Sequence, residues 1–485
     1  MARIVIMGAG VSGHTCASFV RKWLGKDHDV IVVSPRTQYN WIPSNIWVGV
    51  GLMPKKKVVF DLEPIYKKVG IEFVLAAAKR IYPEGSAEEE KPFIEVERVE
   101  ESKKGQVERI TYDFLVNATG PKLDFAKTEG LGPQGGHSLS VCTPDHAIQA
   151  SDALDQCVER MQHGEHQKFL IGTGHGLCTC QGAAFEYIVN LEFELRRRGV
   201  RDKATLTWIS NEYELGDFGM GGMHIKRGGY ITHSKVFTES LFAERQLRWI
   251  KQAHVKKVEP GNVHYETLAG DSREKSFDFS MLIPPFSGVG LSAFSKKGKD
   301  ITSKLFAFNG FLKVDADYTK KPFEEWKASD WPNYYQSGSY DNIFAIGIAF
   351  APPHAISRPQ FSPSGLPIFP TPPRTGMPSA MIGKAVAHSL VDMINGAKGP
   401  TKTASMSQIG AACVASAGAS LLKGSAVSMT VFPIVPDYET YPEYGRDLDK
   451  TFGEVGLAGH WIKRLLHHMF IYKAKLKPFW SFIPE

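Results

Sequence analysis

The chain has 485 residues, of which 43% are hydrophobic and 22% are charged, and its formal net charge is +6. This length leaves room for two or three domains with a sizeable core, and the composition is that of a globular protein. The basic residues do not form the runs typical of nucleic-acid binding, so we expect no nucleic-acid partner. Six cysteines in so long a chain do not make the disulfide framework of a small secreted domain, which leaves some of them free for chemistry.

The first residues, M-A-R-I-V-I-M-G-A-G, start a strand at Arg3, without a charged-then-apolar leader and cleavage site. No run of about 18 apolar residues occurs, so we expect no segment to span a bilayer, although one could lie on its surface. We therefore expect a protein that is made and kept in the cytoplasm.

The chain begins with a strand, a glycine-rich turn and a helix. Residues 3–7 read as a buried strand and residues 14–24 as a helix, and between them stands Gly8-Ala-Gly10-Val-Ser-Gly13. In a strand–turn–helix–strand context this G-x-G-x-x-G predicts a dinucleotide site, because the glycines allow a tight turn and let a pyrophosphate approach the backbone.

The second strand, residues 29–33, does not end in the acidic residue that usually binds the ribose hydroxyls. It ends in Ser34-Pro35-Arg36. Ser34 can bond a hydroxyl, whereas Arg36 would also suit a 2′-phosphate, so this motif alone leaves NADP as an alternative.

Three further stretches extend this first unit. The aromatic loop of residues 41–47, W-I-P-S-N-I-W, contains Ser44 and is typical of a wall over a ring system. Residues 71–76 read as a further parallel strand that leads to Ala77, and residues 78–112 alternate as expected for an antiparallel meander.

Two later strand ends resemble the second and third fingerprints of FAD proteins that contain two dinucleotide domains. The strand before Pro121 ends in Ala118-Thr119-Gly120. Residues 342–348, N-I-F-A-I-G-I, resemble the third fingerprint, in which an aspartate usually holds the ribityl chain. Here Ile348 follows Gly347 in its place.

A second strand–turn–helix unit begins at Lys168, in the sequence K-F-L-I-G-T-G-H-G-L-C-T-C-Q-G-A-A-F-E, and two more strands are expected at 204–210 and 280–284. Its turn carries Cys178 and Cys180. A thiol at a helix N-terminus tends to have a lowered pKa, so the turn indicates sulfur chemistry. The alternative for either cysteine is a small buried side chain that packs the helix onto the sheet.

Residues 351–378 contain nine prolines and little periodicity. A loop this long inside a compact domain is usually functional, often a lid. Residues 379–394 then predict an amphipathic helix, whereas the small-residue stretch 409–418 fits neither helix nor strand clearly.

The tail differs from the rest of the chain. Residues 460–477 contain five Lys and Arg and no acidic residue. The apolar residues recur every three or four positions and predict one helix face: Trp461, Leu465, Met469, Tyr472 and Leu476. A basic amphipathic helix flanked by aromatic residues suits a membrane interface; the alternative is a helix packed on the protein's own body or on a partner subunit.

These motifs together resemble sulfide:quinone oxidoreductases of the flavin disulfide-reductase superfamily, nearly end to end. The matching stretches are Thr119-Gly-Pro-Lys122, Val141-Cys142-Thr-Pro-Asp145-His146-Ala147, Cys180-Gln-Gly-Ala-Ala-Phe-Glu186, Met281-Leu-Ile-Pro-Pro-Phe286, Pro373-Arg-Thr-Gly-Met377 and Ala412-Cys413-Val-Ala. Three cysteines in register make this resemblance more specific than a glycine turn alone.

The resemblance implies that Cys180 and Cys413 face each other beside the flavin and carry sulfur, with Cys142 near the flavin's 8-methyl edge. Glu186 and His146 match polar residues near that site. No metal site is assigned. A quinone pocket lined by Lys463, Phe479 and Trp480 is implied in the tail. For FAD the expected contacts are Gly8, Gly10, Gly13, Ser34, Arg36, Ser44, Ala77, Thr119, Gly120, Pro121, Gly347, Thr375 and Gly376.

The expected fold is α/β, with two tandem Rossmann-like dinucleotide-binding domains and a C-terminal membrane-associating segment. The FAD domain is discontinuous, at residues 1–144 and 315–400, the second domain spans 145–314, and the C-terminal region spans 401–485. The expected partners are hydrogen sulfide, a quinone of the ubiquinone or menaquinone type and the membrane surface. We expect a peripheral protein on the cytoplasmic face of the cell membrane, and a homo-oligomer is allowed.

The sequence also departs from the family. Asp217 stands where relatives often have a histidine, residues 351–378 form a longer loop than usual, and Cys178 is an additional thiol. Three rival functions remain. A type II NADH:quinone oxidoreductase would need an open nicotinamide site at residues 172–176, which lack a clean G-x-G-x-x-G. The others are a flavocytochrome-type sulfide dehydrogenase subunit and a non-catalytic flavoprotein or sulfur-binding scaffold.

Overall fold

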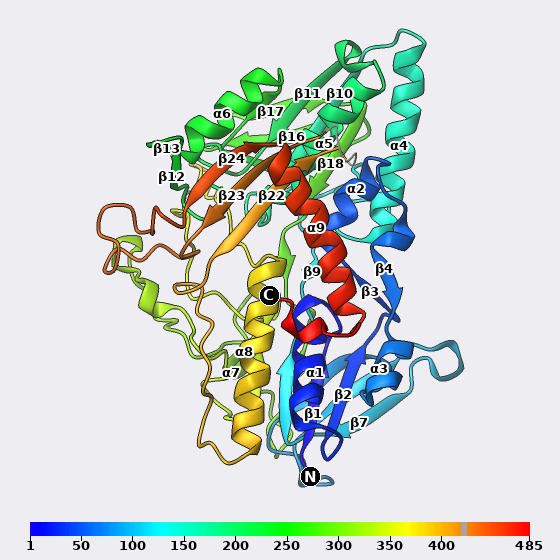
Figure 1. Cartoon of the computed structure of the whole chain (residues 1–485), viewed down its shortest axis with the longest axis vertical. Coiled ribbons are helices and arrows are strands. Elements are labelled where there is room, and N and C mark those ends of the chain that lie inside the picture. Colours follow the sequence, from blue (N-terminus) through cyan, green and yellow to red (C-terminus); the bar gives the residue numbers. More distant parts are fainter. Residues whose placement is uncertain (419–423) are drawn as a thin grey trace.

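The computed structural model describes residues 1–418 and 424–485 (Figure 1). Its largest sheet has the strand order β21-β8-β1-β2-β5-β6-β7. The first five are parallel to one another, and β6 and β7 continue from β5 as an antiparallel meander. Their bounds are Ile343–Ala345 for β21, Phe114–Asn117 for β8, Arg3–Met7 for β1, Asp29–Ser34 for β2, Glu72–Tyr82 for β5, Phe93–Arg98 for β6 and Val107–Thr111 for β7.

Two helices, α1 (Val11–Leu24) and α8 (Gly376–Ile394), pack against each other beside this sheet (Figure 1). They approach closely at Gly383, because a Cβ at this position would stand 2.6 Å from the carbonyl oxygen of Ser12. This crossing holds the N-termini of both helices near the carboxyl ends of the parallel strands.

The second sheet is fully parallel, with the strand order β14-β11-β10-β18. Helix α4 (Pro144–Gln162) leads into it from the first sheet, and α5 (Gln181–Arg197) follows its first strand in the chain. The strands are β10 (Gln167–Thr173), β11 (Ala204–Ile209), β14 (Arg248–Ile250) and β18 (Phe279–Ile283), and a separate antiparallel sheet comprises β15 (Ala253–Glu259), β16 (Asn262–Thr267) and β17 (Ser272–Ser276).

A third, five-stranded sheet has the order β13-β12-β24-β23-β22. The stretch that the sequence left unassigned lies in this sheet, as β22 (Ala411–Ala417), paired with β23 (Ser425–Val431). The other strands are β12 (His224–Arg227), β13 (Tyr230–His233) and β24 (Phe452–Gly456), and α6 (Ser234–Glu244) follows β13. Helix α9 (Leu457–Ala474) follows β24 and runs back toward α1 (Figure 1).

Shorter elements complete the described chain: β3 (Gln38–Asn40), α2 (Asn45–Gly49), β4 (Val59–Asp61), α3 (Glu63–Val69), β9 (Lys122–Leu123), β19 (Phe286–Ser287), β20 (Ser292–Ala293) and α7 (Thr302–Leu305).

The predicted α/β class with two Rossmann-like units is confirmed. Strand β21 returns to the first sheet after the second sheet is complete, so the first unit is discontinuous, as expected. The exact domain boundaries stay predictions. In the part of the chain that the structure describes, no helix has the length and apolar character needed to cross a membrane.

Candidate active site and cofactor cleft

The first glycine turn meets two other strand ends. Gly8 has φ 110°, and a Cβ there would overlap the carbonyl oxygen of Ala118, at the end of β8. Gly347, at the end of β21, has φ 64°, and its Cβ would overlap the hydroxyl of Ser12 in α1. The three predicted fingerprints therefore converge at the carboxyl ends of neighbouring strands, where α/β sheets bind their ligands.

Open space lies beside this crowded turn. A Cβ at Gly10, directly before α1, would have no atom within 4 Å, and the same holds at Gly120, whose φ is 70°. The backbone N–H groups at the start of α1 thus border a gap that can take an anion. The residues present fit a dinucleotide cofactor at this position.

The other predicted cofactor residues have varied surroundings. The buried Ser34 hydroxyl bonds the backbone of Arg36, whose side chain is exposed. Ser44 is fully buried, and its hydroxyl bonds Nδ1 of His467 in α9 at 2.8 Å. The tail helix therefore bonds the same hydroxyl that the sequence predicts as a cofactor contact. Ala77 lies in β5, paired with Glu97.

Two further cofactor residues lie at helix and strand ends. Thr119 bonds the side chain of Asn117 through its hydroxyl at 2.8 Å, directly before Gly120 and Pro121. Thr375 precedes the first residue of α8, Gly376, and its side chain is exposed. The first segment follows a strand of the first sheet, and the second starts the helix that packs on α1.

The second glycine turn places two cysteines between β10 and α5. Cys180 stands at the N-cap of α5 with φ 63°, a left-handed conformation that is uncommon outside glycine. Cys178 is fully buried, and its thiol donates a hydrogen bond to the carbonyl oxygen of Ile283 at 3.1 Å. Cys142 precedes α4, with its N–H bonded to the hydroxyl of Ser140.

The expectation of a lowered thiol pKa in this turn is wrong. Burial raises the pKa of Cys180, and the hydroxyl of Thr179 and the charge of Arg374 oppose the rise only in part. Burial also raises the pKa of Cys142 to about 11, and the neighbouring Cys180 adds to that rise. Desolvation of the thiolate is thus the largest influence on the pKa of each cysteine, and both reduced thiols are neutral near pH 7.

Strand β22 carries the third cysteine of the predicted site. The backbone of Cys413 pairs with that of Met429, and β22 packs on α5, the helix that follows Cys180. The side chain of Cys413 lies outside the described part of the structure. The face-to-face arrangement of Cys180 and Cys413 thus stays a prediction.

Glu186 joins three elements behind the cysteine turn. One carboxylate oxygen accepts a hydrogen bond from the N–H of Ser416 in β22 at 3.3 Å, and the other lies 3.1 Å from Nζ of Lys463 in α9. Burial raises the pKa of Glu186, and Lys463 opposes the rise. The Ser416 hydroxyl in turn bonds Nδ1 of His460. Residues predicted separately for the sulfur site and the quinone site are therefore directly paired.

His146 is buried in the first turns of α4, next to a cavity. The side-chain amide of Gln134 bonds its Nε2 at 2.9 Å, whereas its Nδ1 has no hydrogen-bond partner among the described residues. Burial lowers the pKa of His146, so the ring is neutral near pH 7. Gln134 also lines a cavity of about 480 Å³, formed by the glycine-rich residues 125–136.

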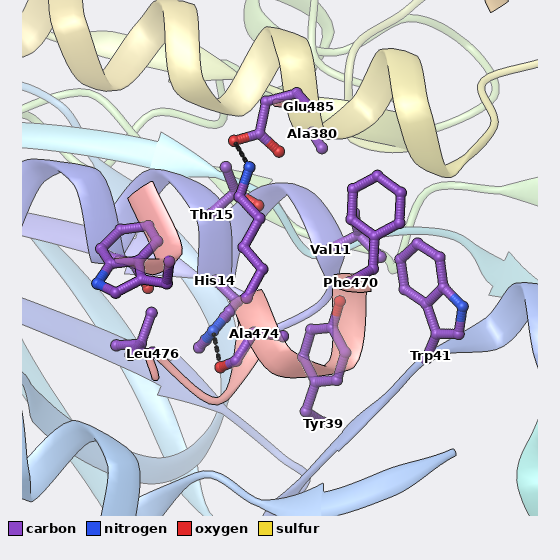
Figure 2. A pocket seen from close by; sticks show the side chains of 13 residues that line it. Val11, His14, Thr15, Tyr39, Trp41, Ala380, Phe470, Ala474, Leu476 and Glu485 are labelled. Atoms are coloured by element: carbon purple, nitrogen blue, oxygen red, sulfur yellow. Dashed lines mark hydrogen bonds and ion pairs between the residues drawn. The ribbon is translucent and has the colours of Figure 1, made fainter. Parts of the chain in front are cut away.

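The end of α9 packs onto α1 (Figure 2). Nε2 of His14 bonds the carbonyl oxygen of Ala474 at 2.8 Å, and the ring of Trp41 stacks on Phe470. Lys473 forms a buried ion pair with Glu485 at 2.5 Å. These side chains surround a cavity of about 20 Å³, which has room for about one water molecule.

Two of the five tail cations thus have acidic partners from outside residues 460–477, since Lys463 pairs with Glu186 and Lys473 with Glu485. The expectation that the positive charge of the tail is uncontested is wrong. Several apolar side chains of the tail face outward, with Leu465 64%, Phe479 79% and Phe482 82% exposed.

The predicted quinone residues do not come together. Lys463 lies in the first half of α9, beside Glu186. Phe479 and Trp480 lie beyond the other end of that helix, where Trp480 packs on Phe19 of α1 with a centroid distance of 4.8 Å. At 1.5 Å per helical residue, Lys463 and the helix end are roughly 16 Å apart along the axis.

Arg374 belongs to one of the motifs that carry the family resemblance, but the sequence did not predict it as a site residue. The structure adds it to the site. It is buried, and its guanidinium donates hydrogen bonds to the carbonyl oxygens of Ile348 and Phe350 at 2.8 and 2.5 Å. Burial lowers its pKa to about 10, and it lies close enough to Cys180 for the two charges to interact. A buried cation beside a reactive turn was not separable by sequence from an ordinary basic residue.

Comparisons with known proteins bear on this arrangement. No protein-family model matches the chain. The chain is 28% identical over 473 residues, 97% of its length, to 91% of the sulfide-quinone reductase of Aquifex aeolicus strain VF5. It is 24% identical over 352 residues, 72% of its length, to 65% of the mitochondrial sulfide:quinone oxidoreductase of Dictyostelium discoideum.

Solved structures agree with this likeness. The sulfide:quinone oxidoreductase of the hyperthermophilic bacterium Aquifex aeolicus superposes with a TM-score of 0.74 at 27% identity, over 98% of this chain and 92% of that one. NDH2 of Plasmodium falciparum superposes with a TM-score of 0.61 at 13% identity, over 98% and 96% of the two chains, and shares the fold alone. The resemblance that the sequence motifs indicate is thereby confirmed.

Proposed function

We propose that this chain is a flavin-dependent sulfide:quinone oxidoreductase, an enzyme that oxidises sulfide and passes the electrons to a quinone. The observation that carries this function is the likeness to the Aquifex sulfide-quinone reductase along 97% of the chain. The cysteine turn after β10 adds a chemical reason, because it places thiols where a dinucleotide-binding turn would hold an anion.

FAD is the cofactor that the first cleft would hold. Gly10 and Gly120 leave open space there, and the N-terminus of α1 supplies N–H groups for the pyrophosphate. Ser34 stands at the end of β2, where the adenosine ribose binds in this fold. When bound, a flavin supplies a carrier that accepts two electrons from one substrate and releases them to another. Arg374 would place a fixed positive charge between the cysteine turn and the third fingerprint.

Cys180 and Cys413 are the pair proposed to accept sulfide. Hydrosulfide attacks one sulfur of their disulfide, the S–S bond breaks, and a new S–S bond to the incoming sulfur forms. One cysteine becomes a persulfide and the other leaves as a thiolate. The bridge is reduced by two electrons as the incoming sulfur is oxidised by two. Cys142 serves as an auxiliary thiol, and His146 holds or releases a proton at Nδ1, which has no hydrogen-bond partner among the described residues.

Glu186 and Lys463 are proposed to serve the proton side of the reaction. Reduction of a quinone to its quinol takes up two protons along with two electrons. Burial raises the pKa of Glu186 and so favours proton uptake by this carboxylate, and Lys463 holds it in place. Phe479 and Trp480 mark the far end of α9, where a quinone tail can leave toward lipid.

The quinone would reach the protein from a membrane. Quinones with long isoprenoid tails, of the ubiquinone or menaquinone type, partition into the bilayer, so the acceptor site must open at its surface. The outward apolar side chains of α9 and the residues after it suit the interface of a peripheral protein on the cytoplasmic face of the cell membrane.

Steady-state assays with two donors test this function. The purified, flavin-loaded protein in detergent is expected to reduce a short-chain ubiquinone analogue with sulfide as donor, and not with NADH. Turnover with NADH and none with sulfide would identify a type II NADH:quinone oxidoreductase instead. Electron transfer to a cytochrome but not to quinone would indicate a flavocytochrome-type subunit. No turnover with any pair of donor and acceptor would indicate a non-catalytic scaffold.

A further inference from the structure

The proline-rich segment of residues 351–378, here called the strap, runs across the second glycine turn. The N–H of Phe369 donates to the carbonyl oxygen of Gly176 at 3.0 Å, and the N–H of Thr371 donates to that of Cys178 at 3.1 Å. The hydroxyl of Thr179 donates to the carbonyl oxygen of Pro372 at 3.2 Å. The strap is therefore bonded to the turn itself, residue by residue.

Protein atoms fill both sides of this turn. A Cβ at Gly176 would overlap the carbonyl oxygen of Pro367 in the strap, and that oxygen also bonds Nδ1 of His254 at 3.0 Å. A Cβ at Gly174 would stand 2.5 Å from Cδ1 of Leu131. The first turn is the opposite case, since Gly10 faces space with no atom within 4 Å. Two glycine turns of one chain thus differ in whether a ligand can reach them.

The position that binds a ribose in a dinucleotide site is also occupied by side chains that bond within this chain. In a dinucleotide-binding unit, an acidic residue at the end of the second strand bonds the ribose hydroxyls. Here Asn211, just after β11, donates from its side chain to the carbonyl oxygens of Gly176 and Cys178 at 3.0 and 3.2 Å. The carboxylate of the next residue, Glu212, is buried and accepts from the hydroxyl of Ser210 and the N–H of Phe218.

The strap is held along its length by side chains as well. The hydroxyl of Ser357 bonds the buried carboxylate of Asp217. Further on, Ser362 and Ser364 both donate to the carboxylate of Glu266. The strap therefore differs from a lid that is free to open, because it is fastened at two places before the point where it crosses the turn and again at that point.

We propose that the strap occupies the place of a nicotinamide dinucleotide at the second glycine turn and is the element that excludes NADH and NADPH as donors. The fold retains the strand, turn and helix of a nucleotide site, but the carbonyl oxygens of its turn and the side chains at its ribose position are bonded to the chain itself. Only a small donor could then reach the cysteines of that turn. This inference concerns nucleotide binding, so it can fail while the proposed reaction with sulfide holds. It can likewise hold while the proposed reaction with sulfide fails.

The test compares NADH binding by three flavin-loaded proteins. They are the unaltered chain, the double variant Phe369→Pro/Thr371→Pro, which removes both strap N–H donors, and the control Pro363→Ala, at an exposed residue of the strap. Binding is followed by the fluorescence of NADH. We expect no saturable binding of NADH by the unaltered chain or the control. The double variant should bind NADH at least about tenfold more tightly than the weakest binding that the assay could detect for the unaltered chain.

Two outcomes would overturn the inference. Saturable NADH binding by the unaltered chain would show that the turn is accessible, and a loosened strap without any gain in binding would show that something else excludes the nucleotide. Flavin content and susceptibility of the strap to protease report that the double variant is folded and loosened. If it does not fold, Thr179→Val, which removes the hydroxyl bond to Pro372 together with the hydroxyl's contact with Cys180, takes its place, with the same two outcomes for NADH binding.

Discussion

Cys180 combines a strained backbone with a desolvated thiol. Its φ of 63° is a conformation that costs a non-glycine residue of the order of 1 kcal/mol, and such positions cluster at functional sites. The strain turns the chain sharply between Thr179 and the first residue of α5. Together with the raised pKa, it indicates a thiol that is positioned by the turn and stays protonated until a partner or a base acts on it.

Replacement of this thiol gives the first prediction. Cys180→Ser should leave the flavin bound, because the first cleft is built from other strands, but should lower the rate of flavin reduction by sulfide by at least about a thousandfold, as for loss of a nucleophile. Stopped-flow absorbance of the flavin is the measurement. Cys157→Ser, a buried cysteine in α4, is the matched control and should keep the full rate. Equal rates in Cys180→Ser and the unaltered chain would remove Cys180 from the mechanism.

The raised pKa of Cys180 predicts how its reactivity depends on pH. Because the thiolate is the nucleophile, alkylation of the reduced protein in a Cys142→Ser background should speed up about tenfold per pH unit from pH 7 to pH 9. Mass spectrometry of the peptide that contains Cys180 follows the reaction with iodoacetamide. A rate that is already constant below pH 8 would mean that the helix N-terminus lowers the pKa after all.

At the scale of the element, α9 shows how far sequence patterns reach. The periodicity correctly predicts a helix with one apolar face, but it cannot say which face turns inward. The buried side chains of α9 include His460, His467 and Lys473, whose partners come from residues far away in the chain or beyond the helix end. Amphipathicity was therefore a reliable guide to the helix and a poor guide to its packing.

The Glu186–Lys463 pair gives a prediction about this packing. Lys463→Met leaves a buried carboxylate without its cation, which typically costs about 3–5 kcal/mol. Urea unfolding should show this loss, and Glu186→Gln in the same background should restore most of it, because the uncharged amide no longer needs the cation. Lys477→Met, an exposed lysine of the same tail, should change stability by less than about 0.5 kcal/mol.

If Lys463→Met proved as stable as the unaltered chain, the ion pair would not contribute to the stability with which α9 packs on the rest of the protein. A loss of stability that Glu186→Gln does not relieve would point to a packing defect rather than to the unpaired charge.

Two buried histidines predict that acid loosens the tail. Burial lowers the pKa of His14 and of His467 to about 4, from an ordinary value of 6.5, and both bond across the interface between the tail and the body. Between these values the unfolded chain binds protons that the folded chain does not. Stability contributed by each histidine is therefore present above pH 6.5 and falls by about 1.4 kcal/mol per unit toward pH 4.

Limited proteolysis between pH 7 and pH 4.5 checks this prediction, with cleavage within residues 457–485 expected to rise as the pH falls. His163→Gln, an exposed histidine at the end of α4, is the control and should leave that profile unchanged. A cleavage rate that is independent of pH after correction for the protease would contradict it.

At the scale of the whole molecule, the sheets could be predicted and the contacts between distant segments could not. Glycine turns, strand ends and parallel order follow from local pattern, and the structure places all three fingerprints of the first unit together. By contrast, Ser44 bonds a residue 423 positions away and Glu186 one 277 positions away. Such pairs depend on how sheets and helices assemble, which neither propensity nor periodicity encodes.

The outward apolar face predicts how the molecule binds lipid. Burying side chains such as Leu465, Phe479 and Phe482 contributes about 1.5–3 kcal/mol each, against about 1 kcal/mol for each free cation at an anionic surface. The triple variant Leu465→Glu/Phe479→Glu/Phe482→Glu should lose binding to vesicles in a flotation assay, whereas Lys475→Glu/Lys477→Glu should weaken it less. Detergent, more than salt, should release the unaltered chain; release by salt alone would contradict this account.

The central claim is that sulfide delivers its electrons to a flavin held by this chain, through the cysteine turn. The most direct test is an anaerobic titration of the flavin-loaded protein with sulfide. The titration is followed by the absorbance at about 450 nm, which is characteristic of oxidised flavin. We expect stoichiometric bleaching in the unaltered chain and recovery of the absorbance when a short-chain quinone is added. A flavin that stays oxidised in excess sulfide, while NADH or another reductant bleaches it, would contradict the claim.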